Sequence, residues 1–98
     1  DLPWLALTDR FRFRALPESV AERFIFGKPP EIVEPGCAVL KGEKRGLKLF
    51  YNRDAVAPSI VELPFKDHFE RETVFYALDF SVTDLQPEFA LQWRFEFF

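Results

Sequence analysis

The sequence predicts an all-β fold, an antiparallel β-sandwich of about seven or eight short strands, with a small barrel as the alternative. Large apolar residues occupy every second position from Phe89 to Phe97, and this period of two places them on one face of a strand. Residues 10–14 and 73–83 alternate in the same way, and turn-forming residues recur between the apolar segments. No helix-length pattern competes with them. Short strands at this spacing are typical of sandwiches and barrels.

The first expected strand covers residues 5–14, where Phe11 and Phe13 point inward and the arginines between them point outward. An outward row of arginines can pair with acidic residues on a neighbouring strand. Residues 20–26 form the second strand, with Glu22, Phe24 and Phe26 on one side. A short helix beginning at Pro17 also fits, because proline is favoured at the first helical position. The β-branched and aromatic content of residues 23–26 favours the strand.

Residues 32–33 form at most a short edge segment before the Pro35-Gly36 turn. Residues 37–41 and 47–51 are two short strands around Gly42-Glu43-Lys44-Arg45-Gly46. Two glycines that flank three charged residues between apolar segments indicate a β-hairpin.

Residues 56–63 contain a strand in which Pro58 indicates an edge or a bulge, and Pro64 ends it. Residues 65–72 are expected to form a polar loop. Long strands follow at 73–83 and 89–98. The short loop between them predicts that they pair antiparallel as the core hairpin. The first and last strands are expected to be neighbours, as is common in sandwiches.

The composition indicates one soluble domain over residues 1–98, since 48% of the residues are hydrophobic and 13 are Phe. Asp1 in place of Met is consistent with a processed protein or with a piece excised from a longer one. The single Cys37 excludes a disulfide scaffold and favours a reducing, cytoplasmic compartment. No apolar stretch has the length of a membrane span. The net charge of −3 argues against nucleic-acid binding.

No arrangement of residues predicts an enzyme, a cofactor or a metal. His68 is the only histidine and lies in a charged loop, where the expected role is a solvated side chain. Cys37 begins an apolar segment and is expected to be a buried, unreactive thiol. Asp79 lies in the middle of a strand. It would need a partner such as Arg10 or Arg12 if it pointed inward, and otherwise it is solvated or paired across strands.

Two groups of residues are candidates for ligand binding. Trp4 and Tyr51 could form a platform for sugar stacking, and Trp4 is the freer of the two. Trp93 lies on the most apolar strand face and is expected to pack in the core. Lys41, Lys44 and Arg45 form a small basic patch at the hairpin tip, which could contact phosphate or an acidic partner.

The interpretation favoured by these patterns is a non-catalytic binding or assembly module that uses strand edges and exposed aromatic residues. Phe98 ends the chain on the outward side of the last strand, where an uncovered aromatic residue favours association. We therefore expect a protein partner or a homodimer rather than a small molecule. The alternative is an accessory, carbohydrate-associated domain of a carbohydrate-active enzyme.

Overall fold

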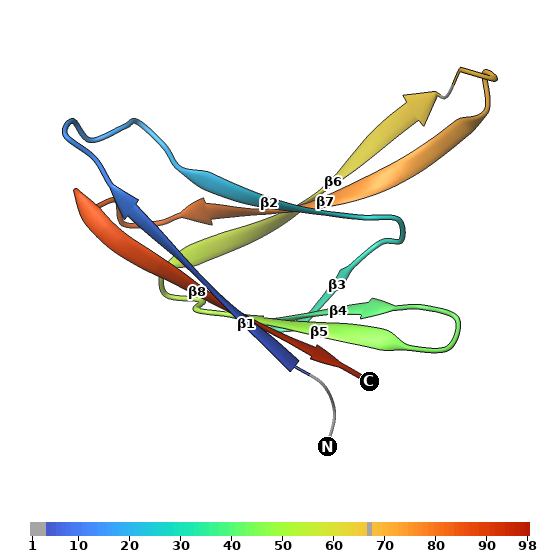
Figure 1. Ribbon diagram of the computed structural model, residues 1–98, viewed down its shortest axis with the longest axis horizontal. Coiled ribbons are helices and arrows are strands. Elements are labelled where there is room, and N and C mark those ends of the chain that lie inside the picture. Colours follow the sequence, from blue (N-terminus) through green and yellow to red (C-terminus); the bar gives the residue numbers. More distant parts are fainter. Residues whose placement is uncertain (1–3, 67) are drawn as a thin grey trace.

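The computed structural model describes residues 4–66 and 68–98, and within these ranges it contains strands and no helix (Figure 1). All of the strand pairs are antiparallel. The strands are β1 (Trp4–Arg12), β2 (Ala21–Phe26), β3 (Glu31–Glu34), β4 (Cys37–Lys41), β5 (Gly46–Tyr51), β6 (Val56–Lys66), β7 (Glu72–Val82) and β8 (Glu88–Phe97). The predicted antiparallel β-sandwich is confirmed.

The strands form two sheets, one of five strands in the order β1-β8-β5-β4-β3 and one of three in the order β2-β7-β6. Figure 1 shows these sheets as two layers, and the chain passes from one to the other several times. β1 pairs with β8 along its whole length, from Trp4 opposite Glu96 to Arg12 opposite Glu88. The first and last strands are therefore neighbours, as the sequence predicts.

The predicted hairpin between β7 and β8 is wrong, because the two strands lie in different sheets. β7 pairs with β2 and β6, whereas β8 pairs with β1 and β5. The connection over residues 83–87 crosses from one layer to the other. The apolar faces of the two strands consequently meet across the core, where the rings of Phe80 and Trp93 lie 4.7 Å apart. This arrangement buries both faces at once.

The predicted end of a strand at Pro64 and the loop over residues 65–72 are also wrong. β6 continues to Lys66 and β7 begins at Glu72, with Phe65 opposite Thr73. β6 lies at the edge of its sheet, where a residue without an N–H can face solvent without loss of a ladder bond. Pro58 therefore lies on an edge strand, as predicted.

The shorter strands follow the sequence closely. β2 is a strand rather than a helix, β3 is a four-residue edge strand, and β4 and β5 form the predicted hairpin. The backbone N–H of Gly42 donates to the carbonyl of Arg45 at 2.8 Å in the hairpin turn. Gly36 adopts a φ of 90° in the turn before β4, a conformation that favours glycine.

The core lies between β7 and β8, with Phe80, Leu78 and Val56 as its largest fully buried side chains. Trp93 is 2% exposed and meets the ring of Phe24 at 5.0 Å in an edge-to-face contact. The sequence analysis expected Trp93 to pack in the core, and the structure confirms it.

The two layers cover each other only in part. The radius of gyration is 15.4 Å, whereas a compact chain of this length has about 13 Å. The accessible surface is 7427 Å², whereas a monomer of this mass exposes about 5,800 Å². In Figure 1 the far end of the β6–β7 hairpin projects beyond the larger sheet. The sandwich thus leaves apolar sheet surface open.

Candidate functional site

The free edge of β1 carries the most exposed apolar side chains of the larger sheet. Trp4 is 58% exposed, Leu5 57% and Leu7 38%. The register places Leu5 and Leu7 on the same face as Phe95 and Trp93, which is the face that turns toward the core. Both leucines are nevertheless exposed on this face. Two leucines with inward orientation are therefore left uncovered.

The backbone of β1 also leaves hydrogen-bonding groups open. The N–H of Phe13 donates to the carbonyl of Pro87 at 2.8 Å, in the same register as the rest of the β1–β8 pair. Residues that bond to the neighbouring strand alternate with residues that point away from it. The odd-numbered residues of β1 thus face β8, and the N–H and C=O groups of Ala6, Thr8 and Arg10 face away from the sheet.

The other sheet edges are shorter or are blocked. β3 has four residues and a shift of register, and β2 has six residues. On β6, the bond from Thr83 N–H to the Ala55 carbonyl fixes the register. By the same alternation, Pro58 and Pro64 occupy outward positions where no N–H is available. β1 is the longest edge that carries neither a proline nor a shift of register.

A groove of about 450 Å³ lies beside this edge, on the outer face of the larger sheet. The outward side chains of its lining are those of Ala6, Thr8, Phe50, Asn52, Gln92 and Arg94. The guanidinium of Arg94 stacks on the ring of Trp4 at 4.6 Å and donates to Glu96 at 3.1 Å. The contact with Arg94 holds one face of the exposed indole ring against the sheet.

Tyr51, which the sequence pairs with Trp4 as a stacking platform, does not share this surface. It is 8% exposed and its ring packs on Phe80 in the core at 4.7 Å. Phe50, its neighbour in sequence, points to the outer face instead. Leu47, Leu49 and Tyr51 occupy every second position. This alternation could have shown that Tyr51 points inward and Phe50 outward.

The structure brings the basic residues Lys41, Lys44 and Arg45 together at the tip of the β4–β5 hairpin, where all three are exposed. Glu43 lies among them and reduces the local positive charge. Phe98 lines the same shallow surface. These residues form a group of their own and do not include Trp4 or Tyr51.

Phe98 follows an interior strand, because β8 lies between β1 and β5. Its backbone exchanges hydrogen bonds with Gly46, at 2.7 and 3.0 Å. Its ring lies against Gly46, where even a Cβ atom would overlap with it, and the ammonium of Lys48 lies 5.7 Å above the ring. The side chain is 43% exposed, as expected from the sequence, although the strand that it follows is paired on both sides. The interface role of Phe98 stays a prediction.

Asp79 faces the outside of the smaller sheet and pairs with Arg23, its cross-strand partner on β2. The guanidinium donates to both carboxylate oxygens, at 2.7 and 2.8 Å. These bonds lower the pKa of Asp79 and raise the pKa of Arg23. The carboxylate is thus held ionised by an ion pair, and the partner is neither Arg10 nor Arg12.

A second carboxyl group, which was not singled out from the sequence, lies between the sheets. Glu22 on β2 meets Asp9 on β1 beside Trp93. One oxygen atom of each acid is buried and has no hydrogen-bond partner, namely Asp9 Oδ2 and Glu22 Oε2. The same holds for the indole nitrogen, Trp93 Nε1. Burial, followed by the hydrogen bond and charge of Asp9, raises the pKa of Glu22 to about 7, and Trp93 opposes this shift. A neutral carboxyl group at this position avoids two adjacent buried charges.

The other candidate reactive groups are isolated from one another. Cys37 is buried and its Sγ lies 3.9 Å from the carbonyl of Ala38. Burial and the charge of Glu34 raise the pKa of this thiol, which disfavours the reactive thiolate. His68 is exposed and its ring lies 3.9 Å from that of Phe69. Within residues 4–66 and 68–98, no three His, Cys, Asp or Glu side chains are grouped as a metal site would require.

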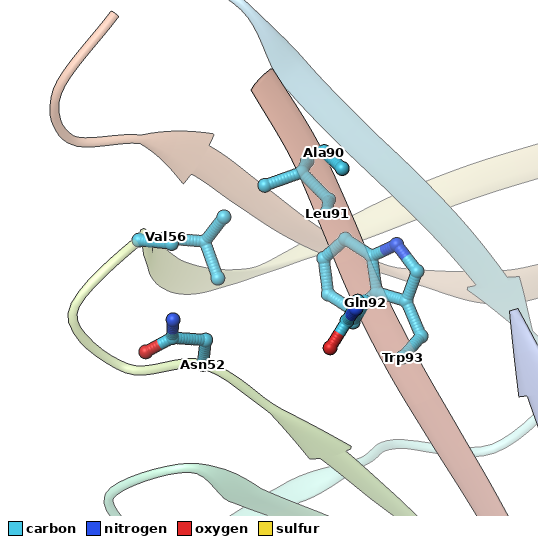
Figure 2. A pocket seen from close by; sticks show the side chains of 7 residues that line it. Asn52, Val56, Ala90, Leu91, Gln92 and Trp93 are labelled. Atoms are coloured by element: carbon cyan, nitrogen blue, oxygen red, sulfur yellow. The ribbon is translucent and has the colours of Figure 1, made fainter. Parts of the chain in front are cut away.

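Figure 2 shows a small pocket of about 80 Å³ between the β5–β6 turn and β8. Val56, Leu91 and the six-membered ring of Trp93 face it, and the indole nitrogen points away from it. Asn52 lies at its edge and accepts a hydrogen bond from the backbone N–H of Asp54 at 3.0 Å. The pocket has room for very few water molecules and has no nucleophile or ionisable side chain in its lining.

No helix in the described part of the chain is long and apolar enough to cross a membrane. Comparison with known proteins identifies no matching family model. It likewise identifies no curated protein that matches the chain.

Proposed function

We propose that this domain is a non-catalytic module that binds a protein partner through the open edge of β1. The observation that carries the proposal is the coincidence, on one strand, of outward backbone groups and uncovered apolar side chains. Ala6 and Thr8 offer N–H and C=O groups, and Leu5 and Leu7 offer apolar surface next to them. Added strands bind to sheet edges with this combination, because the backbone supplies hydrogen bonds and the side chains supply specificity.

The chemistry of the remaining side chains agrees with this proposal. Asp79 is held in an ion pair, Cys37 is buried with a raised pKa, and the half-buried Asp9 and Glu22 face each other between the sheets. An exposed edge of nine residues is otherwise a risk for aggregation. A bound partner would satisfy its backbone groups and cover its leucines.

Replacement of Ala6 by proline tests the edge directly. Ala6→Pro removes an outward N–H without removing a bond to β8, so we expect a fold that persists and binding that weakens at least tenfold. The matched control is Ile60→Pro, which alters an equivalent outward position on β6. The immobilised domain is first exposed to lysate of its source organism, and each retained protein is purified. Calorimetric titration then measures the affinity of each purified protein for the wild type and for both variants.

The proposal requires at least one partner, another copy of this chain included, whose affinity falls with Ala6→Pro and is unchanged with Ile60→Pro. If every measured affinity is the same in the two variants, the edge of β1 is not the binding site.

A second candidate function, binding of carbohydrate, is favoured by the groove beside Trp4. The exposed indole, held by Arg94, borders a surface with the polar side chains of Thr8, Asn52 and Gln92. Aromatic rings and amides in this combination suit sugar stacking and hydrogen bonding. The burial of Tyr51 weakens this candidate, because it removes the second ring of the platform.

If carbohydrate is the ligand, Trp4→Ala should abolish retardation of the domain in native gels that contain soluble polysaccharides. Phe65→Ala is the control, since Phe65 is similarly exposed but lies on β6. Leu7→Lys should leave the retardation intact, because Leu7 projects from the opposite face. Equal migration of the wild type with and without every polysaccharide would exclude this function for the sugars examined.

A further inference from the structure

The edge of β1 is self-complementary, and we infer that its partner is a second copy of this chain, joined by antiparallel pairing of β1 with β1 about a two-fold axis at Ala6. This inference rests on the proposed binding function of the edge and adds the identity of the partner. It joins two five-stranded sheets into one continuous sheet.

The backbone register permits the pairing. The outward groups of β1 belong to even-numbered residues. In an antiparallel pair centred on Ala6, Ala6 lies opposite its own copy and Trp4 lies opposite Thr8 of the second copy. Each of these is an even-numbered residue, so each can exchange two backbone hydrogen bonds with its partner, or about six bonds in all. β1 carries no proline and no bulge that would interrupt them.

The side chains favour this register over those centred on Leu7 or Thr8. With the axis at Ala6, Leu5 lies opposite Leu7 of the second copy, and the symmetry brings four leucines together on one face. An axis at Leu7 would place Leu5 opposite Asp9, and an axis at Thr8 would place Leu7 opposite Asp9. Both alternatives set a carboxylate against an uncovered leucine, which costs free energy. The axis at Ala6 buries the leucines against each other.

The open surface is sufficient for a stable dimer. The chain exposes 7427 Å², which is about 1,600 Å² more than expected for its mass. A standard interface removes about 800 Å² from each partner. The molecule thus has open surface on the scale of an interface, and the exposed Trp4, Leu5 and Leu7 of β1 supply the centre of the proposed one.

Sedimentation velocity at micromolar concentration measures the predicted state. We expect a dimer for the wild type and for Val61→Lys, and a monomer for Leu7→Lys. Leu7 and Val61 are each 38% exposed, so the two substitutions add the same charge at equally exposed apolar positions. Only Leu7 lies at the proposed interface. Circular dichroism and thermal unfolding establish that both variants are folded.

A cysteine at the axis tests the register. Ala6→Cys places two thiols opposite each other across the two-fold axis, within the span of a disulfide, and mild oxidation should give a covalent dimer in high yield. The wild type is the control, since its buried Cys37 should not cross-link. A folded Leu7→Cys variant that cross-links while Ala6→Cys does not would contradict the register.

A wild type that remains monomeric at 100 μM overturns the inference. In that case, a different protein whose affinity falls with Ala6→Pro would still support the binding function of the edge, so the two proposals fail separately. A dimer that Leu7→Lys leaves intact also overturns the inference, because it would be formed by another surface.

Discussion

Replacement of Trp93 by alanine should lower the free energy of unfolding by about 3–5 kcal/mol. Trp93 is 2% exposed and contacts Phe24 and Phe80 of the smaller sheet across the core, at ring-centroid distances of 5.0 and 4.7 Å. Its removal leaves a cavity between the sheets at the place where β8 meets β7. A loss of this size is a large part of the stability of a domain of this length.

Urea denaturation followed by far-ultraviolet circular dichroism measures this loss. Trp4→Ala is the matched control, because it removes the same side chain from an exposed position, and we expect a change below about 0.5 kcal/mol. If both variants unfold at the same urea concentration as the wild type, Trp93 is not part of a packed core.

The alternation in the sequence predicted the faces of the strands well. Trp93 was assigned to an inward face on the period of two alone, and it packs in the core. Phe24 and Phe26 were placed on one side of their strand, and both pack against this core. The period does not say which strand lies beside which. This is why the predicted hairpin between β7 and β8 was wrong. Two strands that each have one apolar face can also bury those faces by packing against each other from two different sheets, as β7 and β8 do.

The same distinction explains the error around β6, and it explains why the cross-strand partner of Asp79 could not be named from the sequence. A proline such as Pro64 would interrupt a strand in the interior of a sheet, but it is tolerated in an edge strand. Whether a strand lies at an edge depends on the order of all the strands in the sheet. Arg23 lies opposite Asp79 because β2 joins the smaller sheet. A search for a partner on the first strand therefore could not find it.

The candidate site was the least predictable feature, because it depends on how much of one sheet the other covers. Leu5 and Leu7 have the spacing of core residues and lie on the core-facing side of the sheet, yet both are exposed. Trp4 was identified from its place near the end of the chain. Phe50, which lines the groove beside it, was missed in favour of Tyr51.

The stability of the fold should decrease as pH rises from about 4.5 to about 7, because folding raises the pKa of Glu22. The pKa rises from 4.5 to about 7, through burial first and then through the hydrogen bond and charge of Asp9. Between these two values the folded state binds more protons than the unfolded state, so the free energy of unfolding falls with increasing pH. Below pH 4.5 the stabilisation is fully present, and above pH 7 it is lost.

The groups that surround Glu22 explain why the shift is upward. β1 contributes the acid Asp9, β8 contributes the indole of Trp93, and β7 places Phe80 opposite it. Only the Trp93 N–H favours the ionised form, and it does not reach hydrogen-bond geometry. The side chain is half-buried, and solvent screening reduces the effect to about 1–3 kcal/mol.

Glu22→Gln should remove this decrease and make the protein more stable than the wild type at pH 8, since a neutral amide replaces a carboxylate that is buried beside another acid. Urea denaturation at pH 4.5, 6 and 8 measures it, with the exposed Glu62→Gln on β6 as the control. Asp79 does not interfere, because its lowered pKa places its own effect below pH 3.8, with the opposite sign. A wild type whose stability is constant from pH 4.5 to 8, or a Glu22→Gln variant with the slope of the wild type, would show that folding does not raise the pKa of Glu22.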